Sequence, residues 1–171
     1  MPSGVVGKVR IVFLDVDGTM TDGAIGWDTQ GDQRSFYVRD GLALDWARES
    51  GLLPVVISGR DSEAARGRMI DLHLEHYLGI KDKVAVAEQV IAREEVLWGV
   101  CAAIGDDLPD VPLLKRVGWP IAVADAVLQV RAVAKHTTVH EGGRGAVREA
   151  VEMLLRHNGD WDDVLKKYEA S

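Results

Sequence analysis

The chain has 171 residues, of which 47% are apolar and 27% charged, and its formal net charge is −7. These values exclude a disordered or collagen-like chain and favour one folded domain over residues 1–171. An acidic chain has no overall basic field for nucleic acid, and one cysteine cannot form an internal disulfide. The longest uncharged apolar stretch, residues 96–104, is far shorter than the ~20 residues of a membrane span. We therefore expect a soluble, cytoplasmic protein.

Short apolar, β-branched runs alternate along the chain with segments of helical periodicity. The predicted strands are residues 8–15, 53–57, 77–80, 100–104 and 119–123, and the predicted helices are residues 41–50, 61–74, 83–95, 113–116, 145–157 and 161–168. This alternation is typical of an α/β fold in which a parallel sheet carries helices on both faces. A glycine-bearing turn between two short segments also predicts a β-hairpin within residues 24–38.

Polar residues follow three of the predicted strands. The first strand leads into Asp15-Val16-Asp17-Gly18-Thr19, the second into Ser58-Gly59-Arg60, and the fourth into Gly105-Asp106-Asp107 with Asp110 shortly after. Ligands of open α/β sheets collect beyond the carboxyl ends of the strands. Carboxylates from Asp15, Asp17 and Asp106 brought together there would require a counterion. Mg²⁺, which prefers oxygen ligands, is the simplest choice.

This set of residues also suits a phosphate ester. Ser58, Lys83 and the backbone N–H groups near Gly18 and Gly59 could hold phosphate oxygens. Asp15 is a competent nucleophile toward phosphorus. Asp17, two residues on, could protonate the leaving oxygen and then activate water.

Each motif alone has an ordinary explanation. A pair of aspartates around one residue is usually a turn or a helix cap, and the aspartates at 106 and 107 could be an N-cap and a first-turn acid. One serine-glycine pair or one lysine carries little information. It is the joint occurrence of these motifs, in order and each at a predicted strand end or helix start, that favours catalysis.

In this order the motifs resemble those of the haloacid dehalogenase superfamily of phosphohydrolases. The matching residues are Asp15 to Thr19, Ser58-Gly59, Lys83, and Gly105-Asp106 to Asp110. The resemblance implies that Asp15 is the nucleophile and a metal ligand, and that Asp17 is the general acid/base and a ligand through its carbonyl. It implies that Asp106 is the third ligand, that Asp110 orients Lys83 or a metal-bound water, and that Asp107 lies beside the metal.

Further motifs resemble a small branch of this superfamily that lacks a cap domain and hydrolyses sugar-acid phosphates. They are Thr21-Asp22-Gly23, Val38-Arg39-Asp40-Gly41, Gly79 to Lys83, Val123 to Ala126 and Gly142 to Glu149. The substrate implied is 3-deoxy-D-manno-octulosonate 8-phosphate, a lipopolysaccharide precursor. Arg60 and Arg68 would contact its carboxylate or sugar. The branch is typically tetrameric, with a flap hairpin, here residues 23–38, and a C-terminal tail, here residues 158–171, near a neighbour's site.

Other functions stay open on the sequence alone. Relatives that act on nine-carbon, sialic-type 9-phosphates tend to carry an acidic residue in place of Arg60, and a broader sugar phosphatase would use the same chemistry. A receiver-type phosphoacceptor also groups acids, a hydroxyl and a lysine around Mg²⁺, but Asp17 would hasten its dephosphorylation. A non-catalytic scaffold of the same fold would not need the intact set of catalytic residues.

Overall fold

The computed structural model describes residues 7–29 and 31–169. Six parallel strands form the main sheet in the order β5-β4-β1-β6-β7-β8, and β2 and β3 form a separate antiparallel pair. In chain order the elements are β1 (Ile11–Leu14), β2 (Gly26–Asp28), β3 (Gly31–Gln33), α1 (Val38–Glu49), β4 (Leu53–Ile57), α2 (Glu63–Asp71), β5 (Glu75–Tyr77), α3 (Lys83–Arg93), η1 (Trp98–Val100), β6 (Cys101–Gly105), η2 (Leu108–Asp110), α4 (Val111–Leu114), β7 (Trp119–Ala122), α5 (Leu128–Val133), β8 (His136–Thr137), α6 (Ala146–Asn158) and α7 (Trp161–Glu169).

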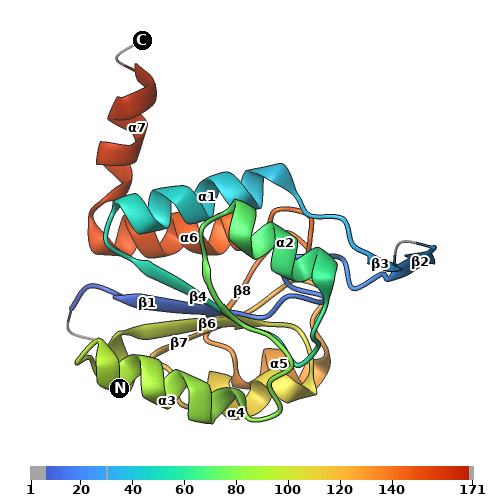
Figure 1. Cartoon of the computed structure of the whole chain (residues 1–171). Coiled ribbons are helices and arrows are strands. Elements are labelled where there is room, and N and C mark those ends of the chain that lie inside the picture. Colours follow the sequence, from blue (N-terminus) through green and yellow to red (C-terminus); the bar gives the residue numbers. More distant parts are fainter. Residues whose placement is uncertain (1–6, 30, 170–171) are drawn as a thin grey trace.

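The molecule has three layers, as an α/β fold requires (Figure 1). α1 and α6 pack side by side on one face of the sheet, with α2 on the same side, and α3, α4 and α5 cover the other face. β1 lies in the middle of the sheet between β4 and β6. Because all six strands run in parallel, the polar residues after β1, β4 and β6 reach the same edge. This confirms the predicted fold class.

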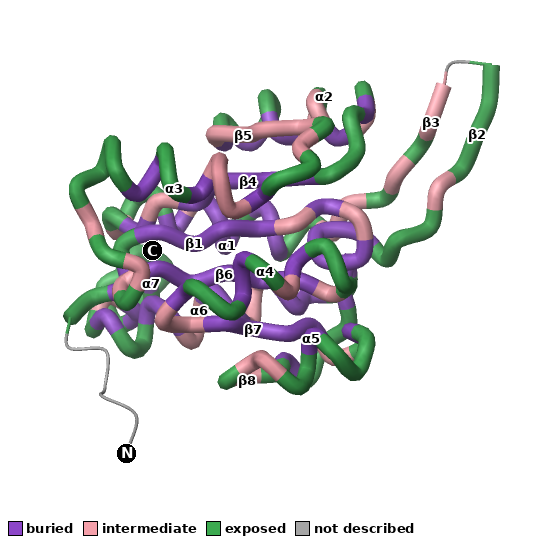
Figure 2. Tube along the Cα trace, turned by 90° about the horizontal axis from the view of Figure 1, so that it is seen from below, coloured by how far each residue is buried: buried purple, intermediate pink, exposed green. Residues whose placement is uncertain are grey.

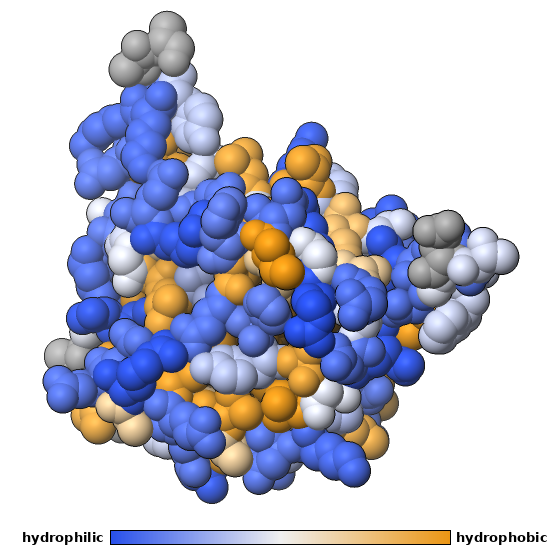
Figure 3. Space-filling view, viewed as in Figure 1, coloured by the Kyte–Doolittle hydropathy of each residue, from blue (hydrophilic) through white to orange (hydrophobic). Residues whose placement is uncertain are grey.

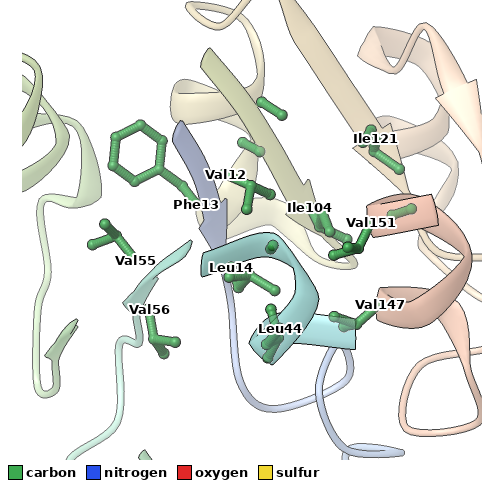
Figure 4. Packing of buried hydrophobic residues seen from close by; sticks show 14 of the residues in the cluster. Val12, Phe13, Leu14, Leu44, Val55, Val56, Ile104, Ile121, Val147 and Val151 are labelled. Atoms are coloured by element: carbon green, nitrogen blue, oxygen red, sulfur yellow. The ribbon is translucent and has the colours of Figure 1, made fainter. Parts of the chain in front are cut away.

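The core forms around β1, whose four residues are all buried. Successive side chains of a strand point to opposite faces. Leu14 accordingly points toward Leu44 of α1 and Val147 of α6, whereas Phe13 points to the other side of the sheet (Figure 4). Helices on both faces explain why the strands read as continuous apolar runs and not as alternating ones.

The hairpin stands out from the sheet and is largely exposed, in contrast to the buried central strands (Figure 2). Trp27 pairs with Asp32 and Asp28 with Gly31, so the connection is tighter than the predicted turn, and Asp32 belongs to β3. The Trp27 side chain is 74% exposed. Gln30, at the centre of the predicted turn, lies outside the described residues.

Several element boundaries differ from the sequence-based ones, for local reasons. α1 begins at Val38, three residues before the predicted start, because extended Tyr37 precedes it without a side-chain cap to mark the position. β5 covers residues 75–77 instead of 77–80, and its partly exposed residues lack the apolar pattern of an inner strand. α5 and β8 are missing from the prediction because six and two residues are too short to show a period.

The C-terminal segment is tied to the body through side chains. Asn158 donates to the carbonyl of Val9 (2.9 Å) and accepts from its N–H (2.7 Å), which joins the end of α6 to the segment two residues before β1. Trp161 of α7 packs edge-on against Trp46 of α1, with ring centroids 5.6 Å apart. Within the described part of the chain, none of the helices has the length and apolar character to cross a membrane. Residues 170–171 of the predicted tail lie outside the described residues.

Candidate active site

The loop after β1 places two aspartates at the sheet edge. The N–H groups of Thr19, Met20 and Thr21 all point to the carbonyl of Val16, at 2.9–3.2 Å, which folds the loop tightly behind Asp15. Gly18 has a φ of +92°, and a Cβ at this position would overlap the carboxylate of Asp106. Glycine is therefore required here both by the backbone conformation and by the approach of the third aspartate.

Lys83 is the first residue of α3, and the side chain of Asp82 caps that helix by accepting from the N–H of Ala85 (3.0 Å). The Lys83 ammonium lies 2.5 Å from Asp15 Oδ1 and 2.7 Å from Asp110 Oδ1, and the residue is only 5% exposed. Burial by itself would lower the pKa of Lys83, but the two carboxylates outweigh it and raise the pKa. Lys83 therefore stays charged beside Asp15.

Asp110 is held by hydrogen bonds on both of its oxygens. Oδ1 accepts from Lys83, and Oδ2 accepts from the N–H groups of Asp106 (3.1 Å) and Asp107 (3.4 Å). A Cβ at Gly105 would lie 2.6 Å from the Asp110 side chain, so glycine makes room for it. The exposed Asp107 caps η2 by accepting from the N–H of Leu108 at 2.7 Å. Asp110 thus positions Lys83 and the loop after β6.

The carboxylates of Asp15, Asp106 and Asp110 can bring one oxygen each within 4.8 Å of one another. Burial, with the nearby charge of Asp110 as the next cause, raises the pKa of Asp15 to about 6. Burial and the charges of Asp15 and Asp110 raise the pKa of Asp106 to about 8. Both oxygens of Asp110 accept hydrogen bonds, whereas Lys83 engages only Oδ1 of Asp15 and Thr19 only Oδ1 of Asp106, so Asp15 and Asp106 are the carboxylates better placed to hold a cation. The donors are all oxygens, which fits a hard divalent ion.

The loop after β4 supplies the hydroxyl of the site. Ser58 is buried, and its Oγ accepts from the N–H of Arg60 at 3.3 Å. The Arg60 side chain is 55% exposed, and its Nε lies 3.4 Å from Asp17 Oδ2. Arg60 therefore reaches over the site from the solvent side and has room to move.

One cleft of about 410 Å³ joins these segments. Its size is within the range of small-molecule sites. It is lined by Asp15, Asp17, Ser58, Gly59, Arg60, Lys83, Asp106, Asp107, Pro109 and Asp110. Of the site residues predicted from the sequence, only Arg68 does not line this cleft.

Arg68 lies on α2 and points toward α1. Its Nη1 pairs with Asp71 at 2.6 Å, and a Cβ at Gly41 would overlap its guanidinium. The Arg68 Nε is buried and has no hydrogen-bond partner among the residues that the structure describes. Within one chain, therefore, Arg68 is not brought to the cleft. Contact between Arg68 and a substrate bound to a neighbouring subunit stays a prediction.

Two further segments support the site, and of these only Arg34 has no counterpart among the residues singled out in the sequence. Arg34, directly after β3, donates to the carboxylate of Asp17. The loop before α6 packs its backbone against the first motif: the N–H of Gly143 donates to the carbonyl of Thr19 at 3.0 Å, and a Cβ at Gly142 would overlap the carbonyl of Gly18. The glycine-rich sequence signals this close approach, whereas nothing near Arg34 in the sequence signals its partner.

Comparison with known proteins agrees with this geometry. The sequence profile of haloacid dehalogenase-like hydrolases matches residues 77–150. The chain is 36% identical over 154 residues to the 3-deoxy-D-manno-octulosonate 8-phosphate phosphatase KdsC of Haemophilus influenzae. The alignment covers 89% of this chain and 86% of that protein. The chain therefore belongs to the haloacid dehalogenase-like hydrolases, within the family of the 3-deoxy-D-manno-octulosonate 8-phosphate phosphatases.

Solved structures extend this similarity to the whole fold. The phosphatase of Moraxella catarrhalis, crystallised with magnesium, phosphate and KDO, superposes with a TM-score of 0.90 at 33% identity and covers 94% of this chain and 93% of that one. The cobalt-bound phosphatase of Haemophilus influenzae gives a TM-score of 0.86 at 35% identity and covers 90% and 91% of the two chains. Both of these related structures are phosphatases that hold a divalent metal ion.

Proposed function

We propose that this protein hydrolyses 3-deoxy-D-manno-octulosonate 8-phosphate to the free sugar acid and phosphate, with Mg²⁺ as cofactor. The observation that carries the proposal is the position of Asp15, a largely buried carboxylate at the centre of the sheet edge between Lys83 and Asp106. The relatives named for this activity support the choice of substrate. Residues 1–171 would act as one hydrolase domain without a cap.

In the proposed reaction, an Asp15 carboxylate oxygen attacks phosphorus in line with the ester bond. An acyl phosphate forms on Asp15, and the bond from phosphorus to the sugar oxygen breaks. Asp17 gives its proton to that oxygen, as general acids do at alkoxide leaving groups. Asp17 then takes a proton from water, which attacks phosphorus, restores the Asp15 carboxylate and releases phosphate.

The remaining residues of the cleft would hold the phosphate and the metal. Ser58, the backbone of Gly59 and Lys83 would donate to the phosphoryl oxygens. Mg²⁺ would be held by the carboxylates of Asp15 and Asp106 and the carbonyl of Asp17. When bound, it neutralises charge on the phosphoryl group. Asp110 would act through Lys83, and Asp107 would hold the loop beside the metal.

Arg60 would bind the carboxylate of the sugar acid, because the two parallel N–H donors of a guanidinium group match a carboxylate. We expect Arg60→Ala to lower kcat/KM for the octulosonate ester about 30-fold, an effect of ~2 kcal/mol, within the range for a charged hydrogen bond. With p-nitrophenyl phosphate, which lacks a carboxylate at that distance, the loss should be less than about threefold. Steady-state kinetics on both esters measure this difference. Equal losses would remove Arg60 from recognition of the sugar acid.

The substrate assignment is tested by phosphate release from a panel of esters. The panel holds 3-deoxy-D-manno-octulosonate 8-phosphate, a sialic-type 9-phosphate, a hexose 6-phosphate and p-nitrophenyl phosphate. We expect kcat/KM for the octulosonate to exceed the others by ~100-fold, a transition-state difference of about 2.7 kcal/mol. A preference for the 9-phosphate would make the sialic-type ester the substrate in place of the octulosonate. Similar, poor hydrolysis of all four would make the protein a broad sugar phosphatase.

Magnesium should stabilise the protein more at pH 8 than at pH 6. Without metal, the pKa values of Asp106 (about 8) and Asp15 (about 6) lie above the ordinary aspartate value. The metal-free fold therefore loses stability as the pH rises and these groups ionise in the folded state. Bound Mg²⁺ offsets this charge, and at pH 6 it must first displace protons. Thermal denaturation in EDTA and in Mg²⁺ at both pH values measures the difference.

Asp106→Asn is the control for this experiment, because it removes the carboxylate with the most raised pKa. We expect its Mg²⁺-dependent rise in Tm to be small at both pH values. Burial also raises the pKa of Asp40 to about 6. Asp40 accepts from the N–H of Arg148, away from the cleft. Its ionisation should therefore change the stability of the metal-free and the Mg²⁺-bound protein equally. A wild-type rise in Tm that does not depend on pH would contradict the expected cation site.

We also propose that the protein works as a homotetramer in the cytoplasm. The hairpin and α7 project from opposite sides of the body, where a neighbouring subunit could reach them (Figure 3). Exposed Trp27 offers an apolar contact on the hairpin. The single buried cysteine suits a reducing compartment. Light scattering of the purified protein measures the oligomeric state, and a monomeric, fully active protein would contradict the tetramer.

A further inference from the structure

The guanidinium of Arg34 is buried between the hairpin, the first motif and the start of α2. Its side chain is 0% exposed. Nε donates to Asp17 Oδ1 at 2.5 Å and Nη2 to Asp17 Oδ2 at 3.3 Å, so both carboxylate oxygens are held. Two parallel hydrogen bonds of this kind fix the plane of a carboxylate as well as its position.

The other end of the guanidinium is held just as firmly. Nη1 donates to Asp32 of β3 and to Ser62 Oγ, the latter at 2.5 Å. Ser62 Oγ in turn donates to Asp32 Oδ2 at 2.7 Å and caps α2 by accepting from the N–H of Ala65. Arg34 is therefore anchored by residues that take no part in the proposed chemistry.

A second arginine approaches Asp17 in a different way. Arg60 is half-exposed, and its Nε lies 3.4 Å from Asp17 Oδ2. It can turn toward a ligand at little cost, because more than half of its side chain is in solvent. Arg34 cannot turn away without depriving the largely buried Asp32 carboxylate of its cationic partner, which is expensive. The two arginines thus have separate tasks at one carboxylate.

We propose that Arg34 is a positioning residue: through its short hydrogen bond to Oδ1 it holds Asp17 in the orientation in which the more loosely held Oδ2 carries the proton to the leaving oxygen. The inference rests on the acid/base role proposed for Asp17. Proton transfer requires the donor to be within hydrogen-bond reach of the oxygen, and a displacement of about 1 Å can cost ~100-fold in rate. Through Arg34, the hairpin stem would set the efficiency of the proton-transfer step.

The test compares two esters that differ in their need for an acid. An alkyl ester such as the sugar-acid phosphate requires protonation of its leaving oxygen, whereas p-nitrophenolate leaves readily without it. We expect Arg34→Met to lower kcat/KM about 30-fold for the alkyl ester and less than about threefold for p-nitrophenyl phosphate. The ratio kcat/KM covers the steps up to departure of the leaving group, so the later hydrolysis of the acyl phosphate does not mask the difference.

Matched variants separate positioning from general damage. Arg66→Met removes an arginine of α2 that pairs with Asp61, before the helix, and should leave the rates for both esters within about twofold of the wild type. Arg34→Lys, which restores the charge without the fork, should recover part of the alkyl-ester rate. If Arg34→Met does not fold, Asp32→Asn loosens the anchor of Arg34 without touching Asp17. It should then show the same preference for p-nitrophenyl phosphate, to a smaller degree.

Asp17→Asn distinguishes the two ways in which the inference could fail. If Asp17→Asn impairs the alkyl ester selectively and Arg34→Met impairs both esters equally, Asp17 is the acid and Arg34 does not position it. If Asp17→Asn impairs both esters equally, the acid role itself is wrong, and the inference falls with it. If both single variants are selective and the double variant is no more selective than Asp17→Asn alone, the two residues act in the same step, as proposed.

Discussion

Asp15→Asn should reduce phosphate release by at least about 10⁴-fold, because the loss of a covalent nucleophile removes most of the rate enhancement. An amide oxygen is a poor nucleophile and would give no stable acyl phosphate. The fold should survive, since the amide has nearly the shape of the carboxylate and Lys83 keeps Asp110 as its partner. Rapid acid quenching with radiolabelled substrate should detect phosphoenzyme in the wild type and none in the variant.

Asp61→Asn is the matched control for this substitution. Asp61 is exposed, lies beside the cleft-forming loop after β4 and pairs with Arg66. We expect its activity to stay within about twofold of the wild type, as for most surface substitutions. Residual activity of more than a few per cent in purified Asp15→Asn would exclude covalent catalysis by Asp15.

Lys83→Met should lower both activity and stability by large amounts. The variant leaves the largely buried carboxylates of Asp15 and Asp110 without their cationic partner. Breaking a buried ion pair on one side costs about 3–5 kcal/mol. We expect kcat/KM to fall ~10³-fold, since Lys83 would also stabilise charge on the phosphoryl oxygens. Chemical denaturation and steady-state kinetics measure the two effects.

Two further variants separate the structural from the chemical part. Lys81→Met removes an exposed lysine two residues earlier and should change neither property appreciably. The double variant Lys83→Met with Asp110→Asn removes one of the stranded charges, so it should recover part of the stability. It should recover none of the activity. Recovery of activity by the double variant would mean that Lys83 acts only by neutralising Asp110.

The sequence alone predicts most of the fold and most of the cleft, because the information is local. β4 has the predicted bounds, since an apolar β-branched run ends directly at Ser58. The carboxylates of Asp15 and Asp106 meet because parallel strands bring their ends to one edge, which needs no knowledge of side-chain packing. The same argument brings Asp110 and Lys83 to the cleft.

The parts that could not be predicted depend on contacts between distant segments. Arg34 lies 17 residues from Asp17 and 28 from Ser62, and the way in which the hairpin folds over the first motif decides that they meet. Arg68 shows the reverse case: a residue of the expected type lies on α2 but turns toward Asp71. The respective tasks of Asp107 and Asp110 also follow only from which backbone N–H groups they face.

The central place of β1 has a consequence for how the protein is made. β1 must pair with β4 about 40 residues later and with β6 about 90 residues later, so one of its edges stays open while half of the chain is synthesised. Three further parts are synthesised later still: Asp106, Gly143, which donates to the carbonyl of Thr19, and Asn158, which hydrogen-bonds Val9. The nascent chain thus carries its nucleophile early but acquires catalytic competence among its last properties. Until then, it exposes an unpaired apolar strand edge that is prone to aggregation.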